Sequence, residues 1–161
     1  MKKILVAVDF SKNTEGVVEQ ASALAQGPGA KLWIVHVTSD ALQRAYESTQ
    51  FYGFAPEFSS GLDGDVEMAR DLCAQEYMRE HESLLNLSSK MRQDGIDAQA
   101  MLLKGEAADL ILEKAEDLDI DVIVMGSHGH SLLRKVLLGS VTEEVLRKTF
   151  CSVLIVPPLP E

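Results

Sequence analysis

Short apolar runs that indicate buried strands alternate along this chain with segments that have the periodicity of helices. Three of the runs, 4–8, 32–37 and 122–125, are rich in β-branched residues and nearly continuous. Continuous apolar runs are typical of parallel strands that helices cover on both faces. Residues 152–156 predict a fourth strand, and 99–103 predict a weaker one between two helical segments. The alternation therefore favours a parallel sheet buried between helices.

Four helices are predicted, at about 11–26, 65–93, 106–118 and 140–148. Ser11 is placed to cap the first of them, and the Gly-Pro-Gly at 27–29 is placed to end it. Strands that alternate with helices in this way favour a doubly wound α/β fold with right-handed crossovers. With 161 residues, the chain is expected to form one domain over 1–161.

Charge and composition exclude several classes of function. The net charge of -10 repels nucleic acid and anionic lipid, which need a field of the opposite sign. No run of apolar residues reaches the length that a transmembrane helix needs. Cys73 and Cys151 lie far apart in the sequence, so we expect no disulfide scaffold and a reducing compartment, the cytoplasm.

The segment 39–64 interrupts the alternation. It carries five aromatic residues among Gly, Ser and Pro, and loops of this length are usually functional or variable. Two interpretations stay open. The segment either packs over an edge of the sheet, or forms a lid or a surface for a partner.

A glycine-rich stretch follows the predicted strand at 122–125. Gly126 and Gly129 would allow positive φ and a close approach of the backbone to phosphate. Gly139 and Ser140 stand at the start of a helix, where free N–H groups and the helix dipole favour an anion. The spacing matches neither the dinucleotide fingerprint nor the P-loop. Ser140 to Glu143 also has the spacing of a capping box, so Ser140 is either a phosphate ligand or a helix cap.

The two strongest polar or glycine signals fall at the ends of predicted strands. Asp9 ends the first strand, and Gly126 follows the strand at 122–125. Ligands of open α/β sheets bind beyond the carboxyl ends of the strands, where the strand order reverses. If these two strands are central neighbours, the binding crevice lies between Asp9 and Gly126.

The spacing Gly126-x2-Gly129-x9-Gly139-Ser140 resembles the complete ATP-binding signature of the universal stress protein family. The resemblance covers nearly the whole chain, including 3–9, 32–37, 105–107, 121–129 and 152–157. It implies a Rossmann-like fold of the adenine-nucleotide alpha-hydrolase type, with five parallel strands in the order 3-2-1-4-5. The segment 39–64 lies where such proteins vary most.

The resemblance also implies a role for each matching residue. Asp9 faces the adenosine at its ribose, while the backbone at Ala7 and Val37 borders the adenine and Met125 lies near it. The phosphates are enclosed by Gly126, Ser127, His128, Gly129, His130, Ser131, Gly139, Ser140, Val141 and Thr142. The implied ligand is ATP, or ADP or AMP, with Mg²⁺ held through phosphates and water. The implied assembly is a homodimer in which Ser152–Val156 pairs with the same strand of a second copy.

The resulting hypothesis is an ATP-binding regulatory dimer that responds to stress and acts on an unidentified protein partner. A slow ATPase, or a phosphotransferase using His128 or His130, is the enzymatic alternative. An interaction protein that binds no nucleotide is the third hypothesis. We predict no catalytic residue, because no base or water-orienting group is evident for phosphoryl transfer. We also predict no protein-held metal, since His128 and His130 lack an evident third ligand.

His36 lies within an apolar strand. We therefore predict that it is a core histidine whose polar atoms are satisfied.

Overall fold

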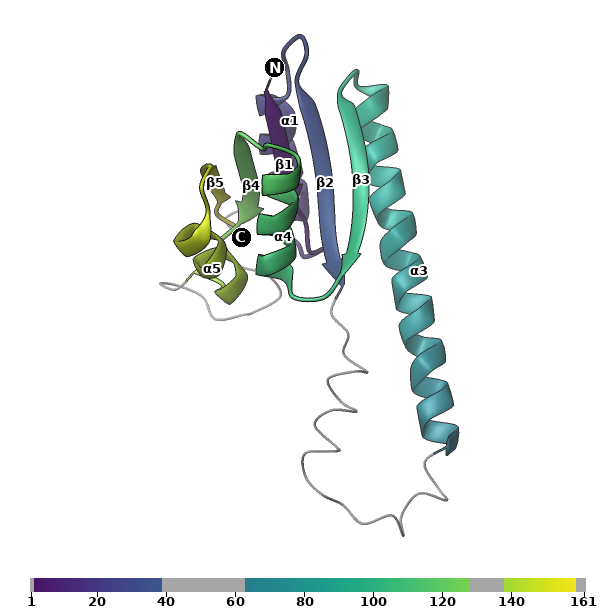
Figure 1. The fold of residues 1–161 in the computed structure, drawn as a ribbon. Helices are drawn as coiled ribbons and strands as arrows, with labels where there is room; N and C mark the ends of the chain where they lie inside the picture. Colours follow the sequence, from purple (N-terminus) through teal and green to yellow (C-terminus); the bar gives the residue numbers. More distant parts are fainter. Residues whose placement is uncertain (1, 39–62, 128–137, 159–161) are drawn as a thin grey trace.

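Figure 1 shows the computed structural model, which describes residues 2–38, 63–127 and 138–158. Over these residues the chain forms five strands and four helices. The strands are β1 (Lys3–Ala7), β2 (Lys31–Thr38), β3 (Asp97–Lys104), β4 (Val122–Gly126) and β5 (Ser152–Val156). The helices are α1 (Thr14–Leu24), α3 (Asp63–Gln93), α4 (Ala107–Asp117) and α5 (Ser140–Lys148). The predicted strands and helices are thus all present.

The strands form one parallel sheet in the order β3-β2-β1-β4-β5, as predicted. β1 is the central strand, and Ile4 stands opposite both Leu32 of β2 and Val122 of β4. Successive strands are added on one side of β1 and then on the other, so the strand order reverses between β1 and β4. The strand order therefore meets the condition for a ligand-binding crevice between β1 and β4.

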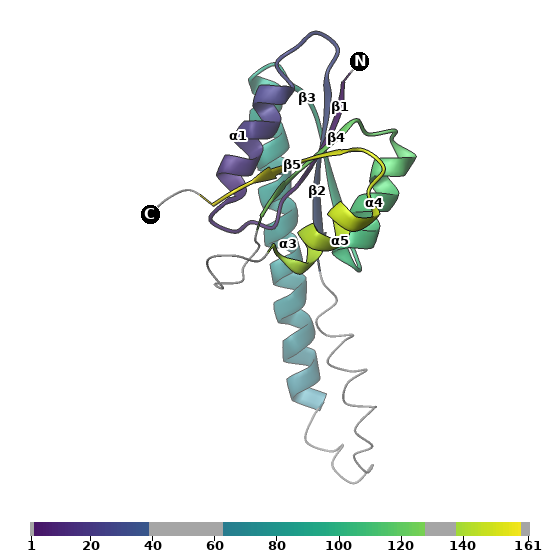
Figure 2. The same cartoon turned by 90° about the vertical axis from the view of Figure 1, so that its left-hand side faces the viewer.

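Helices cover both faces of the sheet (Figure 2). Val6 and Ile34 point to the face covered by α1 and α3, and Leu5 and Ile123 point to the face covered by α4 and α5. All four side chains are fully buried. Each such aliphatic residue contributes about 1.5–3 kcal/mol relative to an exposed position. The continuous apolar runs of the sequence arise because both faces of these strands are buried.

The long helix α3 lies along β3 and extends beyond the end of the sheet (Figure 1). Its C-terminal half contributes the buried Leu84 and Met91, while Leu72 and Met78 in the preceding turns are 57% and 62% exposed. Within the described residues, no helix is long and apolar enough to cross a membrane. Cys73 and Cys151 are both free thiols.

The first helix begins three residues later than predicted. Ser11 is not its cap, because the helix starts at Thr14. Ser11 lies in the turn before it, where its N–H donates a hydrogen bond to Asp9 Oδ1 at 3.0 Å. The N-cap is Asn13, whose side chain makes no capping bond to the helix.

The other bounds differ from the prediction by at most two residues. Most of the variable segment, 39–62, lies outside the described residues, while residues 63 and 64 already belong to α3.

Candidate functional site

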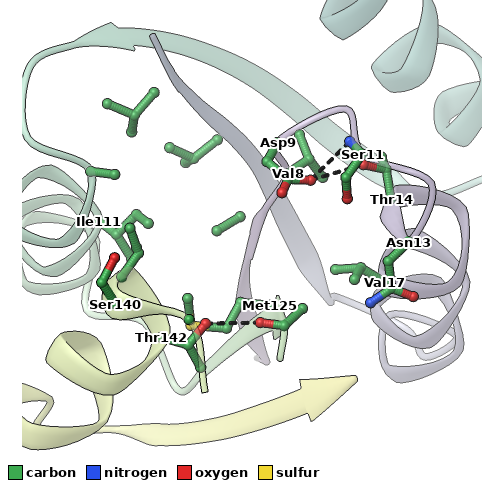
Figure 3. A pocket seen from close by; sticks show the side chains of 17 residues that line it. Val8, Asp9, Ser11, Asn13, Thr14, Val17, Ile111, Met125, Ser140 and Thr142 are labelled. Atoms are coloured by element: carbon green, nitrogen blue, oxygen red, sulfur yellow. Dashed lines mark hydrogen bonds between the residues drawn. The ribbon is translucent and has the colours of Figure 1, made fainter. Parts of the chain in front are cut away.

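A cavity of about 280 Å³ opens at the carboxyl ends of β1 and β4 (Figure 3). The N-terminal turns of α1, α4 and α5 border it. Its lining residues are Ala7, Val8, Asp9, Ser11, Asn13, Thr14, Val17, Val35, Val37, Ala107, Ile111, Met125, Gly126, Gly139, Ser140, Val141 and Thr142. The cavity occupies the place where ligands of this kind of sheet bind.

The β1 side of the cavity is a tight turn organised by Asp9. Its Oδ1 accepts hydrogen bonds from the Ser11 N–H at 3.0 Å and from the Thr14 hydroxyl at 3.4 Å. Phe10, which follows, has a φ of 55°, a conformation that costs a bulky residue roughly 1–3 kcal/mol. The turn therefore places the Asp9 carboxylate in the cavity wall and joins β1 to the start of α1.

On the opposite side, the N-terminus of α5 faces the cavity. The N-cap is Gly139, which has no side chain that could cap the helix. The Glu143 N–H donates to the Gly139 carbonyl, so by helix geometry the N–H groups of Ser140, Val141 and Thr142 have no acceptor within the helix. These donors and the helix dipole favour a negative charge in the cavity. Ser140 is the first helical residue, so the capping-box alternative is wrong.

Thr142 points inward and joins α5 to the end of β4. It is 4% exposed, and its hydroxyl donates to the Gly126 carbonyl at 2.9 Å. The Gly139 N–H donates to the Ser127 carbonyl at 2.8 Å. Residues 127 and 139 are therefore held together, although ten of the residues between them lie outside the described part.

The Val156 carbonyl at the end of β5 connects the two sides of the cavity. It accepts hydrogen bonds from the Ser127 N–H at 3.0 Å and from Asn13 Nδ2 at 3.1 Å. Asn13 is 8% exposed, and its Oδ1 has no hydrogen-bond partner among the described residues. The start of α1, the end of β4 and the end of β5 thus meet at one oxygen atom.

The structure brings most of the predicted site residues together around this cavity. Those that line it are Ala7, Asp9, Val37, Met125, Gly126, Gly139, Ser140, Val141 and Thr142. Ser127 does not line the cavity but supports it through the hydrogen bonds above. His128, Gly129, His130 and Ser131 lie outside the described residues.

The expectation of positive φ at Gly126 is wrong. Gly126 is the last residue of β4, and its ladder partner is Val156 of β5. Strand pairing holds the backbone there in the extended region.

Sequence reasoning missed the residues that the helices contribute. Ser11 and Asn13 come from the turn that leads into α1, Thr14 and Val17 come from the first turns of α1, and Ala107 and Ile111 come from α4. The rule that ligands bind at strand carboxyl ends could have pointed to 11–14, because these residues directly follow Asp9. No local pattern marks Ile111, whose only visible signal is helical periodicity.

His36 is 6% exposed, so the prediction that it is buried is confirmed. The prediction that it is satisfied is only half right. Nδ1 lies 2.7 Å from the Val8 carbonyl oxygen, whereas Nε2 has no hydrogen-bond partner among the described residues.

Comparison with known proteins gives a consistent result. The model of the universal stress protein family matches residues 1–157. Universal stress protein A homolog 2 of Coxiella burnetii is 35% identical over 156 residues, which are 96% of this chain and 94% of that protein. The match thus extends over nearly the full length of both chains.

Solved structures show the same fold. The structure of MJ0577, a universal stress protein of Methanocaldococcus jannaschii, has a TM-score of 0.73 and 26% identity, and covers 99% of this chain and 98% of its own. The universal stress protein from Archaeoglobus fulgidus in complex with dAMP has a TM-score of 0.57 and 25% identity, and the match covers 96% of this chain and 97% of that chain. Strand order, family model and relatives agree, and this chain belongs to the universal stress protein family.

Proposed function

We propose that this protein binds an adenine nucleotide, ATP with Mg²⁺ in the first place, in the cavity between Asp9 and the N-terminus of α5. One observation carries the proposal. A carboxylate acceptor on the β1 side and N–H donors of α5 that have no acceptor within the helix border the same cavity at the strand carboxyl ends. A nucleoside with a phosphate chain has hydroxyl donors at one end and anionic acceptors at the other, so it matches both sides.

Different parts of the cavity suit different parts of the ligand. The apolar walls at Ala7, Val37 and Met125 suit the flat face of adenine, and Asp9 suits the ribose hydroxyls. The N–H groups at 140–142 suit phosphate oxygens. Hydrogen bonds to charged groups contribute about 1.5–3 kcal/mol each. A few of them offset the repulsion between a phosphate chain and a protein of net charge -10.

The family supports the proposal. The relative from Archaeoglobus fulgidus was solved in complex with dAMP, an adenine nucleotide, and is 25% identical to this chain over almost its whole length. The signature residues Gly126, Gly139 and Ser140 all line the cavity here. We therefore assign Gly129, His128, His130 and Ser131 to the phosphates as part of the same proposal.

Magnesium would be held by the ligand more than by the protein. Within the described residues, no group of three His, Cys, Asp or Glu side chains has the arrangement of a metal site. Mg²⁺ usually keeps several waters and binds to substrate phosphates. When bound, the ion would neutralise part of the triphosphate charge.

We further propose that the nucleotide-binding protein acts as a regulatory homodimer through β5. In the described part of the chain, β5 pairs with β4 alone, so one edge of the sheet is open. Open apolar edges tend to pair with another strand, and a second copy of β5 would give a two-fold dimer. Sedimentation velocity on the full chain tests this point, and a monomer at high micromolar concentration would contradict it.

Mass spectrometry of the denatured protein, together with titration of the native protein with Mg-ATP, tests the binding proposal. We expect adenine nucleotide to be released or bound at one site per chain. Gly129→Val should abolish binding, because a side chain there would obstruct the backbone approach to phosphate. Gly27→Val is the matched control, since Gly27 faces open space outside the cavity.

Failure of the wild-type protein to bind any adenine nucleotide would favour the hypothesis of an interaction protein that binds no nucleotide. Multiple turnovers of ATP, lost in His128→Ala, would favour the enzymatic alternative.

A further inference from the structure

Helix α3 presents a row of exposed residues along one side. Successive members of the row are three or four positions apart, so all of them lie within about a quarter of the helix circumference. Met78 is 62% exposed and Leu85 is 46% exposed, although both are apolar. We call the row the outer stripe. It consists of Asp71, Ala74, Met78, His81, Leu85, Ser89 and Arg92.

The outer stripe lies on the side of α3 that faces past the edge of the sheet. The Gly105 N–H donates to the Thr38 carbonyl of β2. Because alternate residues of a strand direct their hydrogen-bonding groups to opposite edges, Ala98 of β3 faces away from β2. Arg92 Nη1 donates to the Ala98 carbonyl at 2.9 Å. Arg92 belongs to the outer stripe, so the stripe lies on the open side of the helix, where another molecule can approach.

The N-terminal half of α3 has no sheet beside it. Glu80 lies next to His36, with 3.3 Å between Oε1 and Nε2, and β2 ends two residues after His36, at Thr38. The part of α3 before about residue 77 therefore extends past the sheet (Figure 1). Helices in proteins gain most of their stability from packing against other elements. A second helix alongside would supply that packing to the protruding end.

The outer stripe is complementary to itself when a second copy runs in the opposite direction. Reversal about a point between residues 81 and 82 places Met78 opposite Leu85 and Asp71 opposite Arg92. The first match joins two exposed apolar side chains, and the second joins opposite charges. In a two-fold pair of helices each match occurs twice.

The small residues and the protruding end fit the same arrangement. Reversal places Ala74 opposite Ser89, and small side chains at the contact let two helices approach closely. The Arg92 guanidinium donates to the Ala98 carbonyl and the Ser89 hydroxyl, which are uncharged, so neither neutralises its charge. Antiparallel pairing also lays the protruding end of each α3 beside the sheet-supported end of the other. Parallel pairing would instead place Asp71 opposite Asp71 and Arg92 opposite Arg92.

We propose that this chain associates with a second copy of itself through the outer stripe, with the two α3 helices antiparallel. The inference goes beyond the proposed nucleotide binding and concerns a different surface from the proposed β5 dimer. The stripe is about 30 Å long, and one pair of helices is a small interface, so the association should depend on concentration. A chain that also pairs through β5 would have two two-fold interfaces and would form a closed tetramer or an open row of copies.

Sedimentation velocity of the full chain from about 1 to 200 µM tests the inference. Met78→Glu places a carboxylate in the apolar match of each copy, so the dissociation constant should rise at least about tenfold. Leu72→Glu is the matched control. Leu72 is 57% exposed on the same helix, but it lies about 120° around the helix from Met78. This variant should therefore associate like the wild type.

Two results of this experiment overturn the inference. One is an equal average mass for the wild type and Met78→Glu at every concentration. The other is an equal loss of association in Leu72→Glu, because the added charge rather than the outer stripe would then be the cause.

A variant of β5 separates the two interfaces. The Ser152 N–H faces β4, so the Val153 N–H faces outward, and Val153→Pro removes it from the open edge. Association through α3 should persist in Val153→Pro and be lost in Val153→Pro/Met78→Glu. An assembly that Val153→Pro abolishes and Met78→Glu leaves intact would support the β5 dimer and overturn the inference about α3.

An exchange of charges tests the antiparallel orientation. Asp71→Arg brings two arginines together at each end of the contact, and Arg92→Glu brings two carboxylates together, so each variant alone should associate at least about fivefold more weakly. In an equimolar mixture, the substituted arginine of one variant meets the substituted glutamate of the other, and Asp71 meets Arg92. The mixture should therefore associate within about twofold of the wild type. Urea unfolding of each variant checks that it is folded. No gain on mixing two folded variants overturns the inference.

Discussion

The hydrogen bond from Thr142 to the Gly126 carbonyl permits a sharp test of how α5 is held against the sheet. Thr142→Val removes the hydroxyl and keeps a side chain of nearly the same shape. Thr142 is 4% exposed and its donor–acceptor distance is 2.9 Å. Loss of the donor removes a hydrogen bond and leaves a partly buried carbonyl with one partner fewer. We expect a cost of about 1–2 kcal/mol in the free energy of unfolding.

For a chain of 161 residues, that cost lowers Tm by about 2–8 °C, since each kcal/mol shifts Tm by about 2–4 °C at this size. Urea unfolding and a thermal scan measure the two quantities. Thr142→Ser is the matched variant, because it keeps the hydroxyl and loses the methyl group. A Thr142→Val variant as stable as the wild type, with Thr142→Ser the weaker one, would refute the reasoning, because packing rather than the hydrogen bond would then hold α5.

The remaining predictions concern a helix start, two glycines outside the helices and strands, and a buried amide. Ser140→Ala should change the free energy of unfolding by less than about 0.5 kcal/mol, because Ser140 is no cap, yet it should weaken nucleotide binding in calorimetry. Gly105→Ala should destabilise by more than about 1 kcal/mol in urea unfolding, because its φ is 145° and a Cβ would lie 3.1 Å from Leu110 Cδ1. Gly27→Ala should be neutral or stabilising by up to about 1 kcal/mol, since a Cβ there meets nothing within 4 Å. Asn13→Ala should cost about 1–3 kcal/mol in the same assay, because it removes the buried bond to the end of β5.

The fold follows from the sequence because the strands and helices have strong local patterns. The run at 122–125 is apolar throughout, as a strand buried on both faces requires. Once β1 and β4 are neighbours, Asp9 and Gly126 necessarily lie at the same edge of the sheet. The strand order alone therefore predicts the position of the crevice, without any information on side-chain contacts.

The contacts that shape the cavity have no such local pattern. Asn13 donates a hydrogen bond to a carbonyl 143 residues away in the sequence. No local sequence pattern around Asn13 predicts this bond. The segment Ser140 to Glu143 has the spacing of a capping box, but Thr142 instead bonds to the Gly126 carbonyl, which only the folded sheet brings near. The pairing of His36 with Glu80 depends likewise on how α3 lies against the sheet.

The open edge of β5 offers a second strand very little backbone. The Ser152 N–H donates to Asp121, and the Val156 carbonyl accepts from Ser127, so both residues face β4. Alternate residues of a strand direct their hydrogen-bonding groups to opposite edges. Only Val153 and Ile155 within β5 therefore present an N–H and a C=O outward, and the proline that follows Val156 has no N–H to extend the ladder.

An antiparallel copy of β5 would thus meet this edge in a short ladder centred on Leu154. Stable interfaces bury about 1,200–2,000 Å², far more than two residues per strand supply. Side chains near the edge, such as Phe150, which is 60% exposed, would have to supply the rest. In such a dimer the sheet edge would determine the orientation of the two copies, and the surrounding side chains would determine how long they remain together.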